Sequence, residues 1–168
     1  YVGLTGDPNA VAAISLCLPV YNIMTGLSNL FGIGGASALA RALGEHNRAK
    51  ARQFFSIAAW SAVAAAVLYA VLLALFQRPL LLLIGGDENN IAYAVTYTTV
   101  TMIWGSLPTI LAAALAHLVR ATGHSTKASL GLMLGAVCNM ALDPLFMFVL
   151  LPKGMELLGA AVATAISN

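Results

Sequence analysis

Residues 54–77, FFSIAAWSAVAAAVLYAVLLALFQ, contain no charged side chain and consist mainly of alanine, valine and leucine. A helix needs about 20 such residues to cross roughly 30 Å of hydrocarbon at about 1.5 Å per residue. The stretch therefore predicts a transmembrane helix. Because it holds few polar groups, we expect this helix to be a lipid-facing part of the scaffold.

The sequence on either side follows the same pattern. Charged residues make up only 8% of the chain, against about 25% in an ordinary soluble domain, and they fall between long charge-free runs. The fold class is therefore all-α, a polytopic membrane helix bundle. The last span stops without a helix-ending signal, so we expect a fragment of a longer protein. The expected transmembrane helices cover about residues 10–40, 54–77, 91–119, 128–150 and 157–168, the last one truncated.

The basic residues indicate the orientation. Six of the eight lie in the loops at 41–52 and 120–127, and only Arg78 and Lys153 lie in the other loops. The positive-inside rule then makes the first set of loops cytoplasmic and the N-terminus extracytoplasmic. We interpret these loops as solvated connectors that set topology, so no nucleic-acid partner is expected.

The two basic loops begin alike, with ARALG at 40–44 and VRATG at 119–123. In both, a glycine, Gly44 or Gly123, stands at the cytoplasmic end of a span. A glycine there can adopt the left-handed conformation that closes a helix. The likeness suggests that one helix-pair unit is used twice, although convergent capping would look the same.

Prolines predict kinks in the first and third spans, at Pro19 and Pro108, because each removes a backbone donor and crowds the preceding turn. Asn22, three residues after Pro19, is expected to make an interhelical hydrogen bond or to contact a substrate path. In the third span, four threonines precede the bend and either line a polar cavity or bond to their own backbone. These threonines are Thr96, Thr98, Thr99 and Thr101.

Small residues recur every four positions along the first span. Such a stripe allows a second helix to approach closely in lipid, where packing holds helices together. We therefore expect a close helix crossing along it. The stripe consists of Ser28, Gly32, Ala36 and Ala40.

The fourth span contains a carboxylate in CNMALDPL, residues 138–145. An aspartate inside hydrocarbon costs about 2.5–3.5 kcal/mol at a helix centre, so Asp143 is expected to have a partner or a function. Gly131, Gly135, Asn139 and Asp143 follow one another at intervals of four, along one side of the helix. The two glycines predict that another helix packs closely there.

This row of residues offers oxygen ligands for a cation. Asn139 lies one turn before Asp143, and Pro144 has no N–H, which leaves the carbonyl of Met140 without its intrahelical partner. The row therefore predicts a site for Na⁺ or a proton, with kinking at Pro144. The alternative is that Asp143 only hydrogen-bonds a neighbouring helix near a proline kink.

Four stretches in register resemble the amino-terminal half of the multidrug and toxic compound extrusion (MATE) transporters, in the DinF-like branch. They are PVYNIMTGLSNLFGIGGASALARALGEHN at 19–47, LVRATGHSTKASL at 118–130, NMALDPLF at 139–146 and LGAAVATAIS at 158–167. The resemblance implies a twelve-helix transporter with two lobes in the plasma (inner) membrane. It implies export of amphipathic, often cationic, compounds in exchange for Na⁺ or H⁺ by alternating access.

The resemblance also implies a set of cation-binding residues. Asn139 and Asp143 match the pair on the family's fifth helix, and Thr164 matches a threonine on the sixth. An aspartate on the family's first helix belongs to the same site and has no counterpart in this chain. No cofactor besides the coupling ion is expected, and no metal site other than Na⁺ at Asp143. The expected partners are small amphipathic substrates, the lipid bilayer and the remaining helices of the full-length chain.

Other functions have weaker support in the sequence. A flippase for lipid-linked precursors, from a related transporter family, would line its cavity with several basic residues. An enzyme would need a second acid, a nucleophile with its base, or a metal set within the spans, and we expect none. The two cysteines, Cys17 and Cys138, are interpreted as small core residues.

Overall fold

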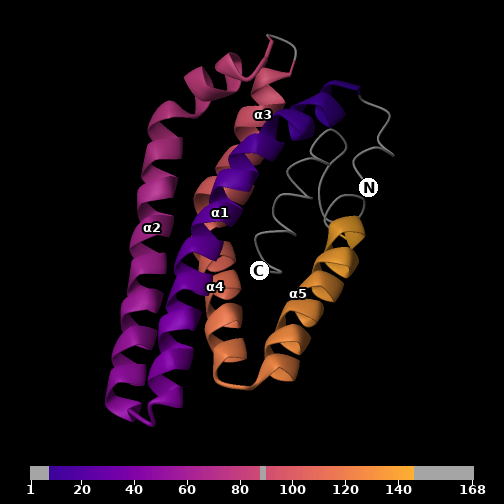
Figure 1. Ribbon diagram of the computed structural model, residues 1–168. Coiled ribbons are helices and arrows are strands. Elements are labelled where there is room, and N and C mark those ends of the chain that lie inside the picture. Colours follow the sequence, from indigo (N-terminus) through magenta and orange to yellow (C-terminus); the bar gives the residue numbers. More distant parts are fainter. Residues whose placement is uncertain (1–7, 88–89, 146–168) are drawn as a thin grey trace.

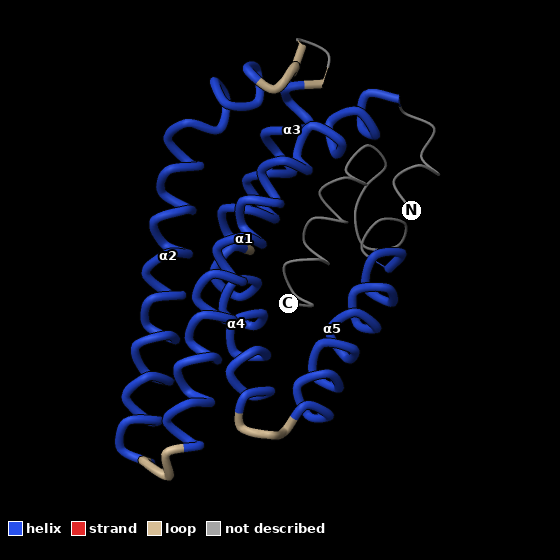
Figure 2. The backbone as a smooth tube through the Cα atoms, viewed as in Figure 1, coloured by secondary structure: helices blue, strands red, loops and turns tan. Residues whose placement is uncertain are grey.

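The computed structural model describes residues 8–87 and 90–145, and these ranges contain helices and turns but no strand (Figures 1 and 2). The all-α fold class is confirmed. Residues 146–150 and 157–168, parts of the fourth and fifth predicted spans, lie outside the described residues. The elements are α1 (Pro8–Gly44), α2 (Arg48–Leu83), α3 (Ile91–Thr98), the π-helix η2 (Thr99–Trp104), α4 (Ser106–Ala121) and α5 (Ser125–Leu145).

Two helices are long and apolar enough to cross a membrane by themselves, at Val11–Gly44 and Arg48–Leu83. The pair formed by α3–η2 and α4 passes the same test as one bent span. Both long helices extend past the charge-free runs. At the start of α2, the side-chain oxygen of Asn47 accepts a hydrogen bond from the backbone N–H of Lys50 at 3.0 Å, which caps the helix. Arg48, Lys50 and Arg52, predicted from the sequence to lie in a loop, therefore belong to the start of α2.

The core is formed where α1 packs against α2 and α4, which also contact each other, while α5 lies beside α4 (Figure 1). The expectation that α2 is only lipid-facing is wrong for one of its sides. Ala62 and Ala66 are completely buried and Tyr69 nearly so, whereas Trp60 and Leu75 are 73% and 68% exposed. Small side chains such as Ala62 and Ala66 on the inner side of α2 allow the helices to pack, while Tyr69 also faces inward.

Close helix crossings occur at two glycines of α1. A β-carbon on Gly32 would come within 3.0 Å of α4 at His117 and Ala114, and one on Gly35 would overlap Ala58 of α2. The predicted small-residue stripe is thus an interface at Gly32. Ala40 is exposed and takes no part. Gly35, which lies outside the four-residue repeat, makes the tightest approach to α2 among the described glycines of α1.

The two basic turns lie at the same end of the bundle, opposite the connection between α2 and α3 (Figures 1 and 2). In the first turn, Lys50 pairs with Glu45 at 2.9 Å. This pair is exposed, so its contribution to stability is small. The left-handed residue is His46, with φ of 54°, and not the predicted Gly44. In the second turn the prediction holds, because Gly123 has φ of 85°.

The third span bends by 48° at Gly105, between η2 and α4. The amide of Gly105 donates to the carbonyl of Val100, five residues back, at 3.1 Å, which is the π-helical pattern. Pro108 is the third residue of α4 and has no N–H, so the carbonyl of Trp104 has no α-helical donor. Pro19 lies inside α1, which continues as one helix on both sides of it, and the kink predicted there stays a prediction.

Replacing Gly105 with alanine is expected to destabilise this bend. Its φ of −80° is ordinary, but a β-carbon would overlap the carbonyl oxygen of Thr101. Overpacking of this kind costs about 1–3 kcal/mol. Thermal unfolding of the purified full-length protein in detergent should show a lower midpoint. Gly26→Ala is the control, since no described atom lies within 4 Å of its β-carbon. Equal midpoints for the two variants would contradict the expectation.

Candidate functional site

The predicted row on α5 borders a cavity of about 600 Å³ between α4 and α5, which we call the α4–α5 cavity. Gly131, Gly135 and Asn139 lie along one wall, and Tyr21 of α1 also reaches it. Asp143 continues the row one turn beyond Asn139, within the described backbone of α5. The cavity is lined by Tyr21, Ala112, Leu115, Ala116, Val119, Lys127, Ala128, Gly131, Leu132, Gly135, Ala136 and Asn139.

At Gly131 this row opens space instead of allowing close packing. A β-carbon on Gly131 would meet no described atom within 4 Å. The expected tight helix crossing is therefore wrong at Gly131, as far as the described residues show. The facing wall of α4 is built from small residues as well, with Ala112 and Ala116 opposite α5. Small side chains on both helices leave the volume of the cavity free.

Polar groups are few on the cavity wall. Asn139 is half-buried and supplies an amide, Tyr21 supplies a phenol ring, and Lys127 lies at the end near the basic α4–α5 turn. The rest of the wall is aliphatic or lacks a side chain. A mostly apolar cavity with a few polar groups suits a small amphipathic molecule.

The remaining predicted cation ligands are only partly described. Asp143 and Pro144 belong to the backbone of α5, and their side chains lie outside the described part. Thr164 lies outside the described residues. A cation site at Asn139, Asp143 and Thr164 stays a prediction. Among the described residues, no cluster of three or more His, Cys, Asp or Glu side chains is placed to hold a metal ion.

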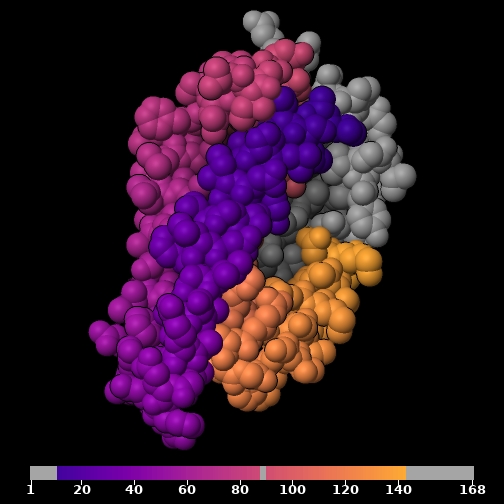
Figure 3. All heavy atoms as spheres, in the orientation of Figure 1, coloured from indigo at the N-terminus to yellow at the C-terminus, as the bar shows by residue number. Residues whose placement is uncertain are grey.

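Asn22 does not line the α4–α5 cavity, although its neighbour Tyr21 does. The side chain of Asn22 is exposed and makes no hydrogen bond to any described residue. Figure 3 shows that the near face of α1 is uncovered along much of its length. Sequence reasoning missed Tyr21, because nothing in the sequence distinguishes an aromatic residue at a cavity from one facing lipid.

The threonines before the bend bond to their own backbone, which is the second of the two alternatives predicted from the sequence. Thr96 donates to the carbonyl of Ala92 at 2.9 Å, and Thr101 donates to that of Tyr97. Thr98 and Thr99 also lie within reach of Gln77 on α2. Gln77 was missed as well. The available signal was an amide side chain at the end of an otherwise apolar run.

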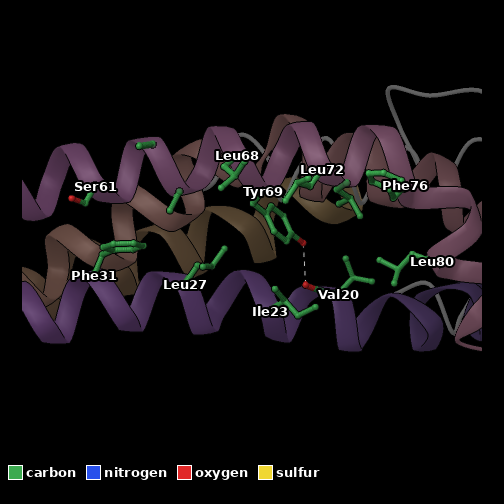
Figure 4. A pocket seen from close by; sticks show the side chains of 13 residues that line it. Val20, Ile23, Leu27, Phe31, Ser61, Leu68, Tyr69, Leu72, Phe76 and Leu80 are labelled. Carbon is green, nitrogen blue, oxygen red and sulfur yellow. Dashed lines mark hydrogen bonds between the residues drawn. The ribbon is translucent and has the colours of Figure 1, made fainter.

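A second hollow, of about 780 Å³, lies between α1 and α2 and is almost entirely apolar (Figure 4). The hydroxyl of Tyr69 points across it and donates to the carbonyl of Val20 at 3.0 Å. This bond satisfies the phenol without a ligand. The hollow therefore offers little chemistry besides apolar contact.

The two cysteines differ in their surroundings. Cys17 is buried, and its thiol lies 3.1 Å from the carbonyl of Ala13, so the expectation of a core residue is confirmed. Cys138 is exposed in the described part of the chain, which contradicts that expectation there. Both thiols are free.

Comparison with known proteins identifies relatives over the whole chain. The family model MatE matches residues 1–145. The multidrug export protein MepA of Staphylococcus aureus (strain NCTC 8325 / PS 47) is 30% identical over 169 residues, covering 100% of this chain and 36% of that protein. MepA of Staphylococcus saprophyticus is 29% identical with the same coverage. The chain thus spans about a third of the length of the curated relatives it matches.

The fold has a close counterpart among solved structures. A crystal structure of MATE in the bent conformation superposes with a TM-score of 0.90 at 25% identity. The match covers 96% of this chain and 35% of that chain. The helix arrangement described above is therefore that of one part of a larger transporter.

Proposed function

The chain belongs to the MatE family of membrane transporters, and from this we propose that the full-length protein is a cation-coupled antiporter. It exports amphipathic, often cationic, compounds and takes up Na⁺ or H⁺ in exchange. Support for the substrate class comes from the relatives, which are named multidrug export proteins. The chain is one part of this transporter and depends on the remaining helices of the full-length protein.

The α4–α5 cavity is the observation that carries the proposal. Asn139 lines this mostly apolar cavity, and Asp143 follows one turn later on the same helix. An apolar cavity accepts the body of an amphipathic compound, while amide and carboxylate oxygens suit a hard cation such as Na⁺. One cavity would thereby bring substrate and coupling ion close together.

Coupling follows if the two ligands favour different arrangements of the helices. A ligand shifts a conformational equilibrium only by its differential affinity for the two states. We propose that cation binding at Asn139, Asp143 and Thr164 favours one state of alternating access. Substrate binding in the cavity favours the other.

The proposed location is the plasma membrane, with the N-terminus of this chain extracytoplasmic. The structure has multiple helices of membrane-spanning length, so a multi-pass membrane protein is supported directly. The two basic turns share one end of the bundle, which agrees with a single cytoplasmic side (Figure 1). The lipid bilayer is thus the other partner of this chain.

No observation favours the alternative of a flippase for lipid-linked precursors. Such a carrier is expected to line its cavity with several basic residues for a phosphate headgroup. Among the described lining residues of the α4–α5 cavity, Lys127 alone is basic, and it lies at the turn.

Replacing Asn139 with alanine in the full-length protein is expected to weaken cation dependence of export. A hydrogen bond or ligand contact to a charged group contributes about 1.5–3 kcal/mol, so the half-saturating cation concentration should rise about tenfold to a hundredfold. The measurement is efflux of a fluorescent organic cation from everted vesicles, at graded Na⁺ and at graded pH.

Cys138→Ala is the matched control for Asn139→Ala, because it truncates the adjacent, exposed residue outside the cavity lining. It should leave the cation dependence unchanged. Absence of gradient-driven export by the wild-type protein would refute the proposed function. Export with an unaltered cation dependence in Asn139→Ala would remove Asn139 from the coupling site.

A further inference from the structure

One side chain of α2 contacts the start of the π-helix. The side-chain oxygen of Gln77 lies within hydrogen-bonding distance of the hydroxyls of Thr98, at 3.3 Å, and Thr99, at 3.2 Å. Thr98 is the last residue of α3 and Thr99 the first of η2. The amide of Gln77 thus bridges from α2 to the junction where the α-helical pattern changes into the π-helical one.

This junction determines where the next helix points. The π-helix ends at Gly105, where the 48° bend redirects the chain into α4. Ala112, Leu115, Ala116 and Val119 of α4 then form one wall of the α4–α5 cavity. A change in the helical pattern at Thr99 would rotate and shift this wall, since a π-turn contains one residue more than an α-turn.

The bridge is suited to hold the junction in place. Gln77 is half-buried near the end of a membrane-spanning helix, and Thr98 is completely buried. Because Thr98 is buried, water has little access to its hydroxyl, so hydrogen bonds of that hydroxyl to protein atoms are retained. Each hydroxyl carries only one proton, and each lies closer to a backbone carbonyl of α3 than to Gln77. The hydroxyl of Thr98 is 2.8 Å from the carbonyl oxygen of Ala94, and that of Thr99 is 2.7 Å from the carbonyl oxygen of Val95. Bonding to Gln77 therefore competes with bonding inside α3.

We propose that Gln77 is a positioning residue for the α4–α5 cavity. By accepting from Thr98 and Thr99, it fixes the start of the π-helix relative to α2, and through the bend it sets the position of α4. The expected effect of Gln77 on substrate export rests on the proposed function. The inference that Gln77 positions α4 rests only on the contacts described above.

The test uses Gln77→Leu and the double variant Thr98→Val, Thr99→Val in the full-length protein. Thr96→Val is the matched control. Thr96 lies on the same helix, is exposed, and its hydroxyl donates to the carbonyl of Ala92 only, among described partners. The double variant also keeps the test decisive if Gln77→Leu fails to insert, because valine has nearly the same shape as threonine.

The first measurement is a distance between spin labels in a cysteine-free background, with one label at Leu75 of α2 and the other at Leu134 of α5. Both side chains are more than 60% exposed. Gln77→Leu and the double threonine variant should broaden this distance distribution, and Thr96→Val should not.

The second measurement is the half-saturating substrate concentration for export. It should rise about threefold for each hydrogen bond lost, and on the order of tenfold for both, with an unchanged amount of inserted protein.

The combined triple variant adds a test of mechanism. If the three side chains act as one unit, the triple variant should change the distance distribution and the half-saturating substrate concentration no more than the more affected of the other two variants does. A wild-type distance distribution in both Gln77→Leu and the double variant would overturn the inference, as would an equal effect of Thr96→Val. If the wild-type protein exports nothing, the proposed function fails, and the distance measurement still decides the structural part.

Discussion

Gly35→Ala is expected to lower the free energy of unfolding and the yield of folded full-length protein. The added β-carbon would overlap the β-carbon of Ala58 on α2 and approach Leu118 of α4 to 3.2 Å. The nearest obstacle is a β-carbon attached directly to the backbone, so relief requires the helices to move apart. Overpacking costs about 1–3 kcal/mol, and larger side chains at this position should cost more. Thermal unfolding in detergent measures the loss.

Two further variants separate this clash from a general effect of replacing glycine. Gly34→Ala alters the adjacent residue, whose β-carbon would meet no described atom within 4 Å, and should be tolerated. Ala58→Gly removes the obstacle, so combining it with Gly35→Ala should restore most of the lost stability. If the double variant remains as unstable as Gly35→Ala, the crossing of α1 and α2 does not explain the effect.

Asp143→Asn is expected to abolish gradient-driven export by the full-length protein without reducing insertion. Asp143 lies 18 residues after the start of α5, about 27 Å along the helix. Asparagine removes the negative charge that would hold the coupling cation, so export driven by a cation gradient should be lost. Asparagine is uncharged and less costly in hydrocarbon, so the amount of inserted protein should not fall.

The measurement is substrate efflux in everted vesicles under imposed Na⁺ and H⁺ gradients, applied separately. Asp87→Asn is the matched control, because Asp87 lies outside the long apolar runs. Its backbone N–H and side chain exchange hydrogen bonds with Asn90 at the start of α3. Asparagine serves well at a helix N-terminus, so this variant should export normally. Unchanged export by Asp143→Asn would identify Asp143 as a packing residue and assign coupling to other helices.

The bend in the third span illustrates how far sequence reasoning extends. A proline inside an apolar run indicated a bend, and the chain does turn at Gly105, three residues before Pro108. The π-helix before it was not predicted. The local sequence does not specify whether a turn closes with four or five residues, and contacts from other helices cannot be read from it. In the structure, the side-chain oxygen of Gln77 on α2 lies within hydrogen-bonding distance of Thr98 and Thr99, where the π-helix starts.

The candidate site was predicted in part. The row on α5 was identified from spacing alone, and Gly131, Gly135 and Asn139 do face one cavity. Sequence reasoning assigned close packing to the two glycines, and either an interhelical hydrogen bond or a substrate path to Asn22. The structure has open space at Gly131 and places Tyr21, not Asn22, at the cavity. The roles of Asp143, Pro144 and Thr164 stay predictions.

The sequence by itself determined that this is a membrane helix bundle of the MatE family, with its basic turns at one end. The lengths of the charge-free runs and the positions of Arg and Lys can be read from the chain without knowing which residues contact one another. Only the tertiary structure decided which side of each helix faces a neighbour, a cavity or lipid. The physical reason is that lipid is as apolar as the core, so burial leaves no hydrophobic periodicity in a membrane helix. Packing, as at Gly35 against Ala58, supplies that information instead.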